Sequence, residues 1–274
     1  MPLSKTDIAE FLQFEKSGWE KAADSYHSHW GPLSRQSAVP MLDAAKVISG
    51  SRVLDVATGA GYIAAEAEGR GAIVSGIDFS TAQVNLAKKT YPSIDFQQGD
   101  ADELNFDEDS IDAVVIGFGV NHFPDPERVF AEVYRVLKAG GIFAYTVWAS
   151  PEQNPGFSII LSAIEEFGNA ANNLPPAPPY FRFANAEESR DTLSDIGFRE
   201  PRTLIVPQYW NHQSPDMVFD AFYYGAVRAT AMLRAQSLPV QKQIKAKARN
   251  EVLQYHKNDR FMIPVPAALS YATK

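Results

Sequence analysis

The chain has 274 residues, of which 45% are hydrophobic and 21% charged, as in a soluble globular protein with a normal core. Its net charge of −8 disfavours nucleic-acid and anionic membrane partners. It contains no cysteine, which excludes disulfides, thiolate metal sites and a cysteine nucleophile. The first residues lack a signal-peptide pattern, and no apolar run approaches the roughly 20 residues of a membrane span. We therefore expect a cytoplasmic protein.

The first 50 residues or so are expected to be helical and are rich in aromatic side chains. Strands and helices then alternate, which indicates right-handed crossovers in an open parallel sheet with helices on both faces. The predicted strands are 51–57, 73–80, 94–104 with its loop, 111–120 and 142–149. The predicted helices are 61–72, 81–92, capped by Ser80 or Thr81, and 126–141, closed by glycine.

The pattern changes after residue 150. We expect helices at 154–169, 185–198, 215–236 and 240–257, a proline-rich connection at 172–183, a sixth strand within 199–210 and a last strand at 262–273. Asn185 would cap the second of these helices. The predicted division is residues 1–50, residues 51–150 and residues 151–274, which together form one structural unit rather than independent domains.

A glycine-rich turn follows the first predicted strand. In "VLDVATGAGYIA", Gly59, Gly61 and Ala64 match the G-x-G-x-x-A pattern that dinucleotide enzymes share. Asp55 stands four residues before Gly59, where its carboxylate would repel a pyrophosphate. The same carboxylate suits a ligand that ends in an ammonium group. S-adenosylmethionine (SAM) has such a group and no phosphate.

Two further acids end the next two strands. Asp78 can accept both ribose hydroxyls, and the Asp100 carboxylate can accept the adenine amino group. Ligands bind open parallel sheets at the carboxyl ends of the strands. An NAD enzyme would also use Asp78, but Asp55 and Asp100 argue for SAM.

Four segments together resemble the class I SAM-dependent methyltransferases: "VLDVATGAG", "SGIDFSTAQ", "QGDADELNF" and "IDAVVIGFGVNHFPDPERVFAEVYRVLKAGG". The resemblance covers Val53 to Ala149 and is closest to the small-molecule branch with the ubiquinone and menaquinone methylases. It implies an α/β, Rossmann-like, seven-stranded and mostly parallel sheet whose last strand is antiparallel. It also implies an N-terminal helical lid, over residues 1–50, and helical insertions that cap the substrate.

The resemblance implies SAM as cofactor, S-adenosylhomocysteine as product, and a set of cofactor-binding residues. Gln83 departs from the family pattern, because many relatives carry methionine there; we expect it to keep the adenine contact. The set comprises Tyr26 and Trp30 of the lid; Asp55, Ala57, Thr58, Gly59 and Gly61 near the methionine portion; Asp78, Phe79, Ser80 and Gln83 around the ribose and adenine; Asp100, Ala101 and Asp102 beside the adenine; and Gly117 and Phe118 near the sulfonium.

Residues outside that set could handle the acceptor. His122 follows the fourth strand and is the candidate general base, or else a loop histidine that orders the turn. His27 and His29 do not make a metal site, and no metal is expected. Eight aromatic residues could line an apolar pocket, pack in the core or bury a homodimer interface: Phe157, Tyr180, Phe181, Trp210, Phe219, Phe222, Tyr223 and Tyr224.

The sequence therefore predicts a SAM-dependent methyltransferase that acts on an O, N, S or C nucleophile of a small, largely apolar or aromatic molecule. One alternative is a SAM-binding protein of the same fold with a pericyclic, decarboxylating or structural role. An NAD-dependent oxidoreductase and a non-catalytic interaction protein are further alternatives. The acceptor and the methylated atom remain open at this point.

Overall fold

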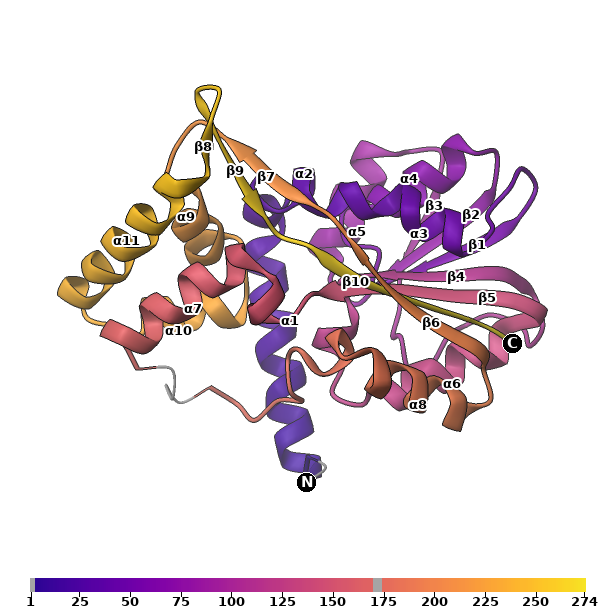
Figure 1. The fold of residues 1–274 in the computed structure, drawn as a ribbon. Coiled ribbons are helices and arrows are strands. Elements are labelled where there is room, and N and C mark those ends of the chain that lie inside the picture. Colours follow the sequence, from indigo (N-terminus) through magenta and orange to yellow (C-terminus); the bar gives the residue numbers. More distant parts are fainter. Residues whose placement is uncertain (1–2, 170–173) are drawn as a thin grey trace.

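A central sheet of seven strands organises the chain, and the computed structural model describes residues 3–169 and 174–274 (Figure 1). The strand order is β3-β2-β1-β4-β5-β10-β6. The strands are β1 (Arg52–Val56), β2 (Ile73–Asp78), β3 (Asp95–Gln98), β4 (Ile111–Gly117), β5 (Leu137–Trp148), β6 (Arg199–Val206) and β10 (Ala267–Thr273). β10 is antiparallel to β5 and β6, whereas β1 to β5 pair in parallel. The predicted Rossmann-like, mostly parallel sheet is confirmed.

Helices cover both faces of the sheet because its central strands are apolar on both sides. Val53 packs in the cluster under α3 (Ala38–Ala44), α4 (Tyr62–Gly69) and α5 (Thr81–Thr90). The next residue, Leu54, packs in the cluster under α6 (Pro126–Val136) and α8 (Ala186–Ile196). Successive side chains of a strand point to opposite faces, so one strand contributes to both clusters.

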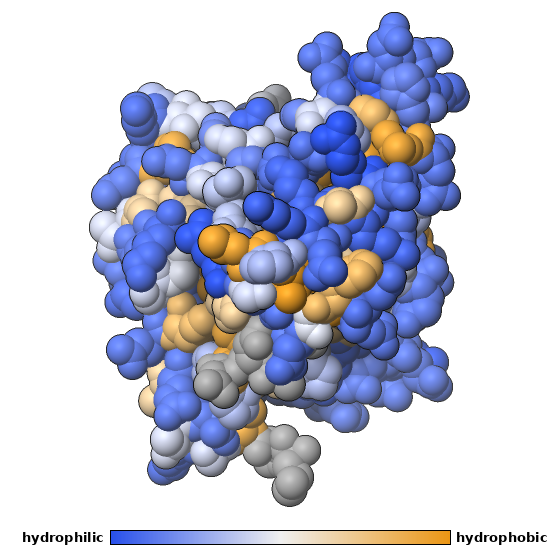
Figure 2. All heavy atoms as spheres, turned by 90° about the vertical axis from the view of Figure 1, so that its left-hand side faces the viewer, coloured by the Kyte–Doolittle hydropathy of each residue, from blue (hydrophilic) through white to orange (hydrophobic). Residues whose placement is uncertain are grey.

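A helical cap stands beside the sheet (Figure 1). It consists of α7 (Pro155–Phe167), α9 (Met217–Tyr224), α10 (Arg228–Arg234) and α11 (Leu238–Val252). A small sheet, in the order β7-β9-β8, adjoins the cap and contains β7 (Tyr209–His212), β8 (His256–Lys257) and β9 (Arg260–Pro264). The outward face of the cap is mainly hydrophilic, with apolar side chains in small groups (Figure 2). Buried residues such as Ile160, Phe222 and Ile244 show that three of these helices turn apolar side chains inward.

The N-terminal helix α1 (Lys5–His29) runs between the cap and the sheet (Figure 1). A capping box starts it, in which the Ser4 hydroxyl accepts from the Asp7 amide and the Asp7 carboxylate accepts from the Ser4 amide. The helix contacts α5 of the core and α9 of the cap, and α2 (Gly31–Ser34) follows it. α1 thus touches the two parts of the molecule that a lid would join.

Two predicted strands are each divided between the two sheets. The segment 199–210 forms β6 and β7, and the segment 262–273 forms the end of β9 and all of β10. The breaks fall at Pro207 and Pro266, which lack the amide hydrogen that a continuous ladder needs. The Val265 amide donates to the carbonyl of the buried Gln208, so the two segments pass from one sheet to the other at the same place.

Two helix predictions were also wrong in detail. The helix at 126–141 is not closed by glycine: α6 ends at Val136, and Leu137 already pairs with Ile111 as part of β5. The segment 215–236 forms two helices, α9 and α10, on either side of Gly225. A Cβ on Gly225 would come within 2.8 Å of the Trp30 indole, so the chain passes too close to that ring for a side chain.

Residues 1–2 of the predicted N-terminal segment and 172–173 of the predicted proline-rich connection lie outside the described residues. The division of the chain into parts at residues 50 and 150 stays a prediction. Over the described part of the chain, none of the helices combines the length and apolar character that crossing a bilayer requires.

Candidate active site

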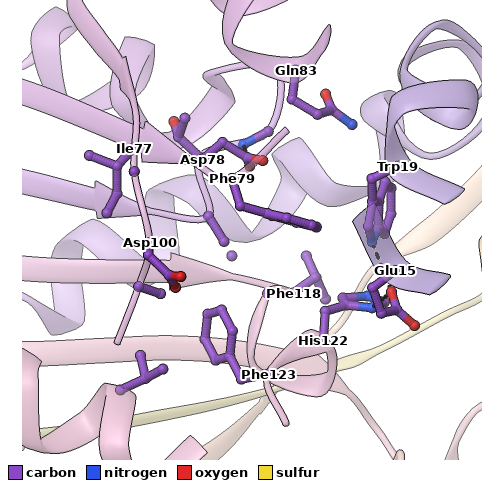
Figure 3. Close-up of a pocket in the computed structure, with 18 of the residues that line it drawn as sticks. Glu15, Trp19, Ile77, Asp78, Phe79, Gln83, Asp100, Phe118, His122 and Phe123 are labelled. Carbon is purple, nitrogen blue, oxygen red and sulfur yellow. Dashed lines mark hydrogen bonds and ion pairs between the residues drawn. The ribbon is translucent and has the colours of Figure 1, made fainter. Parts of the chain in front are cut away.

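The carboxyl ends of the central parallel strands border a cavity of about 230 Å³ (Figure 3). β1, β2 and β4 bring Asp55, Asp78 and Gly117 to it. This is the edge at which open parallel sheets bind ligands. We call it the glycine-loop cavity. Of the residues predicted to bind the cofactor, those that line it are Tyr26, Asp55, Ala57, Thr58, Gly59, Asp78, Phe79, Gln83, Asp100, Ala101, Asp102, Gly117 and Phe118.

Three residues of the predicted set do not line this cavity. Gly61 adopts a left-handed φ of +81°, which turns the chain into α4, and a Cβ there would come within 2.7 Å of Phe96. Ser80 caps α5 by accepting from the Gln83 amide at 3.3 Å. Trp30 lines a neighbouring cavity, and its indole donates to the Ala221 carbonyl at 3.0 Å.

Asp55 is buried behind the glycine loop. Its Oδ2 accepts from the Thr58 hydroxyl at 2.7 Å and from the Ala64 amide at 3.1 Å, which ties the loop to the start of α4. Its Oδ1 has no partner among the described residues. Burial raises the pKa of Asp55 to about 7, although both hydrogen bonds act in the opposite direction. Asp55 therefore ties the loop to α4 through one oxygen, and its other oxygen is buried without a partner among the described residues.

Asp78 ends β2 beside the loop (Figure 3). One of its oxygens accepts from the Gly59 amide and the other from the Ser80 amide, each at 2.9 Å. A carboxylate has about four acceptor positions, so both oxygens can accept a further hydrogen bond. Burial raises the pKa of Asp78 to about 6. Two backbone amides thus orient the carboxylate without using all of its capacity.

The backbone is strained and closely packed where the glycine loop passes the end of β4. Ala57 and Phe118 adopt left-handed φ angles of +54° and +58°, a conformation that costs a residue with a side chain roughly 1–2 kcal/mol. A Cβ on Gly117 would come within 2.3 Å of the Ile63 side chain, and one on Gly119 within 2.7 Å of Ala57. Small residues therefore let the two segments approach each other at the cavity wall.

A second cavity of about 180 Å³ lies between the sheet and the cap. We call it the aromatic cavity. It shares four lining residues with the glycine-loop cavity, namely Trp19, Tyr26, Phe118 and His122. Its wall includes Trp148, which stacks on Phe118 with ring centroids 3.9 Å apart. The two cavities therefore meet along a shared wall made mostly of aromatic rings.

The eight aromatic residues singled out in the sequence divide into two groups. Phe157, Tyr180, Phe181 and Phe222 line the aromatic cavity. Trp210, Phe219, Tyr223 and Tyr224 do not line it. Trp210 and Phe219 are buried core residues instead. The pocket and core interpretations thus each account for part of the set.

Glu15 of α1 is among the residues of this site that the sequence analysis missed. Its Oε2 lies 2.9 Å from Nδ1 of His122 and accepts from the Trp19 indole at 3.1 Å (Figure 3). The side chain is buried, and its Oε1 has no partner among the described residues. Glu15 interrupts a stripe of apolar residues at helical spacing, Phe11, Trp19, Ala22 and Tyr26. That interruption is the signal that could have identified it.

Two further contacts tie α1 to the glycine-loop side. The Glu20 carboxylate accepts from the amides of Thr81 and Ala82, at 2.7 and 3.2 Å, at the start of α5. Nδ1 of His27 hydrogen-bonds to the hydroxyl of Tyr62, which also lines the glycine-loop cavity. Over residues 3–169 and 174–274, no cluster of histidine, aspartate and glutamate side chains could hold a metal ion.

Comparison with known proteins agrees with the methyltransferase class that this fold and site indicate. The family described as "Methyltransferase domain" matches residues 54–145. A demethylmenaquinone methyltransferase of Renibacterium salmoninarum is 33% identical over 58% of this chain and 71% of its own. One of Chlorobaculum parvum is 41% identical over 41% of this chain and 48% of its own, so the match spans about half of that relative. The chain belongs to the class I SAM-dependent methyltransferases of the menaquinone-methylase type and is an enzyme that methylates a small molecule.

Solved structures share the fold. The YcgJ protein of Bacillus subtilis has a TM-score of 0.58 at 21% identity, over 87% of this chain and 97% of its own. Phosphoethanolamine N-methyltransferase 2 of Haemonchus contortus, solved with S-adenosylhomocysteine, has a TM-score of 0.52 at 20% identity. The match covers 87% of this chain and 52% of that protein's chain. At these identities the likeness concerns the fold alone.

Proposed function

We propose that SAM binds in the glycine-loop cavity and that the acceptor binds in the aromatic cavity. The supporting observation is that the two cavities share Trp19, Tyr26, Phe118 and His122. A methyl donor on one side of this wall and a nucleophile on the other would meet there. SAM, when bound, supplies an electrophilic methyl group on a sulfonium centre.

The residues of the glycine-loop cavity fit SAM. Asp55 has a buried oxygen without a partner, which suits the ammonium of the methionine portion. Asp78 keeps acceptor capacity on both oxygens for the two ribose hydroxyls. Gln83 is buried with its Oε1 unpartnered, beside the position proposed for the adenine. Asp100, Ala101 and Asp102 would complete the adenine side.

The same features disfavour a dinucleotide. A pyrophosphate bound at the glycine loop would lie close to Asp55, which forms no ion pair with a described lysine or arginine. Bringing two phosphate charges beside this desolvated carboxyl group is unfavourable. The cationic amino-acid end of SAM would instead be attracted to the carboxylate.

On the acceptor side, we propose His122 as the general base for a nucleophile that keeps its proton near neutral pH. If His122 donates to Glu15 through Nδ1, its Nε2 is free to accept a proton from the acceptor. Glu15 would hold the ring in that orientation. The aromatic wall would exclude water from the nucleophile and align it for direct displacement.

Calorimetric titration of the full chain with S-adenosylhomocysteine tests the first half of this proposal, with NADH as the parallel control. Micromolar binding of the first ligand and none of the second is the expected result. Binding of NADH alone would overturn the proposed cofactor. Tight binding of S-adenosylhomocysteine without methyl transfer to any member of a panel of hydroxyl, amine and thiol acceptors would favour a non-methylating role.

We also propose that residues 1–50 act as a lid over the cofactor, that the protein is cytoplasmic and that it forms a homodimer. The contacts from Glu15, Glu20 and His27 of α1 to the cavity walls support the lid role. Light scattering of the purified chain tests the dimer.

A further inference from the structure

The aromatic cavity has a charged group in its wall that the proposed methyl transfer does not use. Arg228, at the start of α10, is the one lysine or arginine among the described residues that line this cavity. The other lining residues are aromatic or aliphatic apart from His122. Arg228 does not line the glycine-loop cavity. It therefore belongs to the acceptor's side of the site.

The guanidinium of Arg228 is only partly satisfied. Its Nη2 donates to the Pro175 carbonyl at 3.0 Å, and its carbon lies 5.6 Å from the centre of the Phe14 ring. Its Nη1 is buried and has no hydrogen-bond partner among the described residues, and the guanidinium forms no ion pair with a described carboxylate. A buried N–H of a cation without an acceptor is costly, so such groups are normally paired.

Arg228 has a negative charge in its surroundings but no directly paired anion among the described residues. Burial lowers the pKa of Arg228, whereas the charge of Glu15 and the hydroxyl of Tyr180 raise it. Oε2 of Glu15 lies beside Nδ1 of His122 and accepts from the Trp19 indole. Glu15 makes no direct ion pair with Arg228. Arginine presents donors in a planar fork that matches a carboxylate, and a charge-assisted hydrogen bond is about twice as strong as a neutral one.

We infer that the acceptor is an aromatic or otherwise flat apolar molecule with an anionic oxygen group, of the carboxylate type, that binds Arg228. This inference rests on the proposed use of the aromatic cavity. The apolar frame would pack against rings such as Phe157 and Phe222, and the anion would set which end of the molecule faces the shared wall. Arg228 is then a residue that determines specificity rather than one that takes part in methyl transfer.

Two matched probes test this inference. 2-Naphthoate carries an anionic carboxylate, and naphthalene-2-carboxamide has nearly the same shape without the charge. Both are titrated at pH 7.5 into the full chain saturated with S-adenosylhomocysteine. Naphthoate is expected to bind about tenfold tighter than the amide or better, as one charge-assisted hydrogen bond in a buried site predicts.

Variants separate a ligand contact from a structural charge. Arg228→Gln should abolish the preference for naphthoate, Arg228→Lys should retain part of it, and Arg234→Gln is the control. Arg234 lies on the same helix but is exposed and does not line the cavity. S-adenosylhomocysteine affinity and thermal unfolding, measured for every variant, report whether Arg228→Gln still folds.

The outcomes are distinct. Equal affinity of the wild-type chain for the two probes, or no binding of either, overturns the inference while leaving a measured affinity for S-adenosylhomocysteine intact. A preference that survives in Arg228→Gln also overturns it and makes Arg228 a structural counter-charge to Glu15. Failure of S-adenosylhomocysteine to bind the wild-type chain would be a failure of the proposed function instead.

Discussion

Oε2 of Glu15 lies 2.9 Å from Nδ1 of His122, although the two residues are 107 positions apart in the chain. Glu15 belongs to α1, and His122 ends the short 3-10 helix η2 (Val120–His122) that follows β4. Both residues line the glycine-loop cavity, and His122 also lines the aromatic cavity. One contact thus joins the N-terminal helix to the wall where the donor and acceptor are proposed to meet.

If His122 is the general base, His122→Ala should lower kcat by roughly 10²–10⁴-fold, the range typical of a general base. The affinity for S-adenosylhomocysteine should change much less, because the proposed proton transfer is on the acceptor's side. Steady-state turnover and calorimetry on the same preparation check this. Added imidazole should restore part of the activity. Equal losses of turnover and cofactor affinity would make His122 a cofactor-pocket residue instead.

Glu15 is a positioning residue in this scheme, so its replacement should act through His122. Glu15→Gln should lower kcat with little change in KM, and Glu15→Asp should rescue part of the loss by restoring the charge. Combining Glu15→Gln with His122→Ala should cost little more than His122→Ala alone, since the two residues act as one unit. Additive losses would show that Glu15 serves the fold independently of His122.

Asp78 is proposed to accept both ribose hydroxyls. Asp78→Ala should weaken S-adenosylhomocysteine binding by on the order of 2–4 kcal/mol, because two hydrogen bonds to a buried carboxylate are lost. Asp95→Ala is the matched control, since Asp95 begins β3, is exposed and bonds to the Gln97 side chain. Calorimetric dissociation constants decide the matter, and an unchanged affinity in Asp78→Ala would remove the ribose assignment.

The buried carboxyl groups predict a pH dependence with opposite signs for stability and binding. The pKa of Asp55 rises from 3.8 to about 7 on burial, so the folded chain holds a proton that the unfolded chain releases. The stability of the ligand-free chain should therefore fall as pH rises from about 4 through about 7, and Asp78 adds to this slope with a pKa of about 6.

Binding of an ammonium group favours the ionised form of Asp55. The affinity for S-adenosylhomocysteine should therefore rise between pH 5.5 and pH 7.5, with proton release that calorimetry detects as a dependence on buffer ionisation enthalpy. In Asp55→Asn, the ligand-free chain should lose part of its stability slope, and ligand affinity should be low at every pH. A pH-independent affinity in the wild-type chain would contradict the proposed ammonium contact.

Gly61 offers a prediction about stability alone. Gly61→Ala should destabilise the fold more than Gly50→Ala, although the two glycines have φ angles of +81° and +83°. Both variants incur the left-handed strain, roughly 1–2 kcal/mol, but only the Cβ at position 61 also meets Phe96, at 2.7 Å. Urea unfolding of the two variants measures the difference. Equal losses would mean that the Phe96 ring shifts without cost.

Local pattern was enough to predict much of the core. The apolar runs of β1 and β4, the Ser80 and Asn185 caps and the acids at the ends of β1 and β2 each depend on neighbours within a few residues, so the sequence alone indicates them. The seven-stranded sheet followed from the strict alternation of strands and helices together with the family resemblance. The glycine loop and its two buried acids, Asp55 and Asp78, were found for the same reason.

Contacts between distant segments were decided only by the tertiary structure. The pairing of Glu15 with His122, the unpartnered Nη1 of Arg228 and the crossing at Pro207 and Pro266 each depend on how whole elements pack, which no local window of sequence encodes. The same holds for Trp30, whose burial against Gly225 places it in the aromatic cavity. Hydrophobic burial is non-directional, so the sequence shows that aromatic rings gather, and packing determines which of them enclose a cavity.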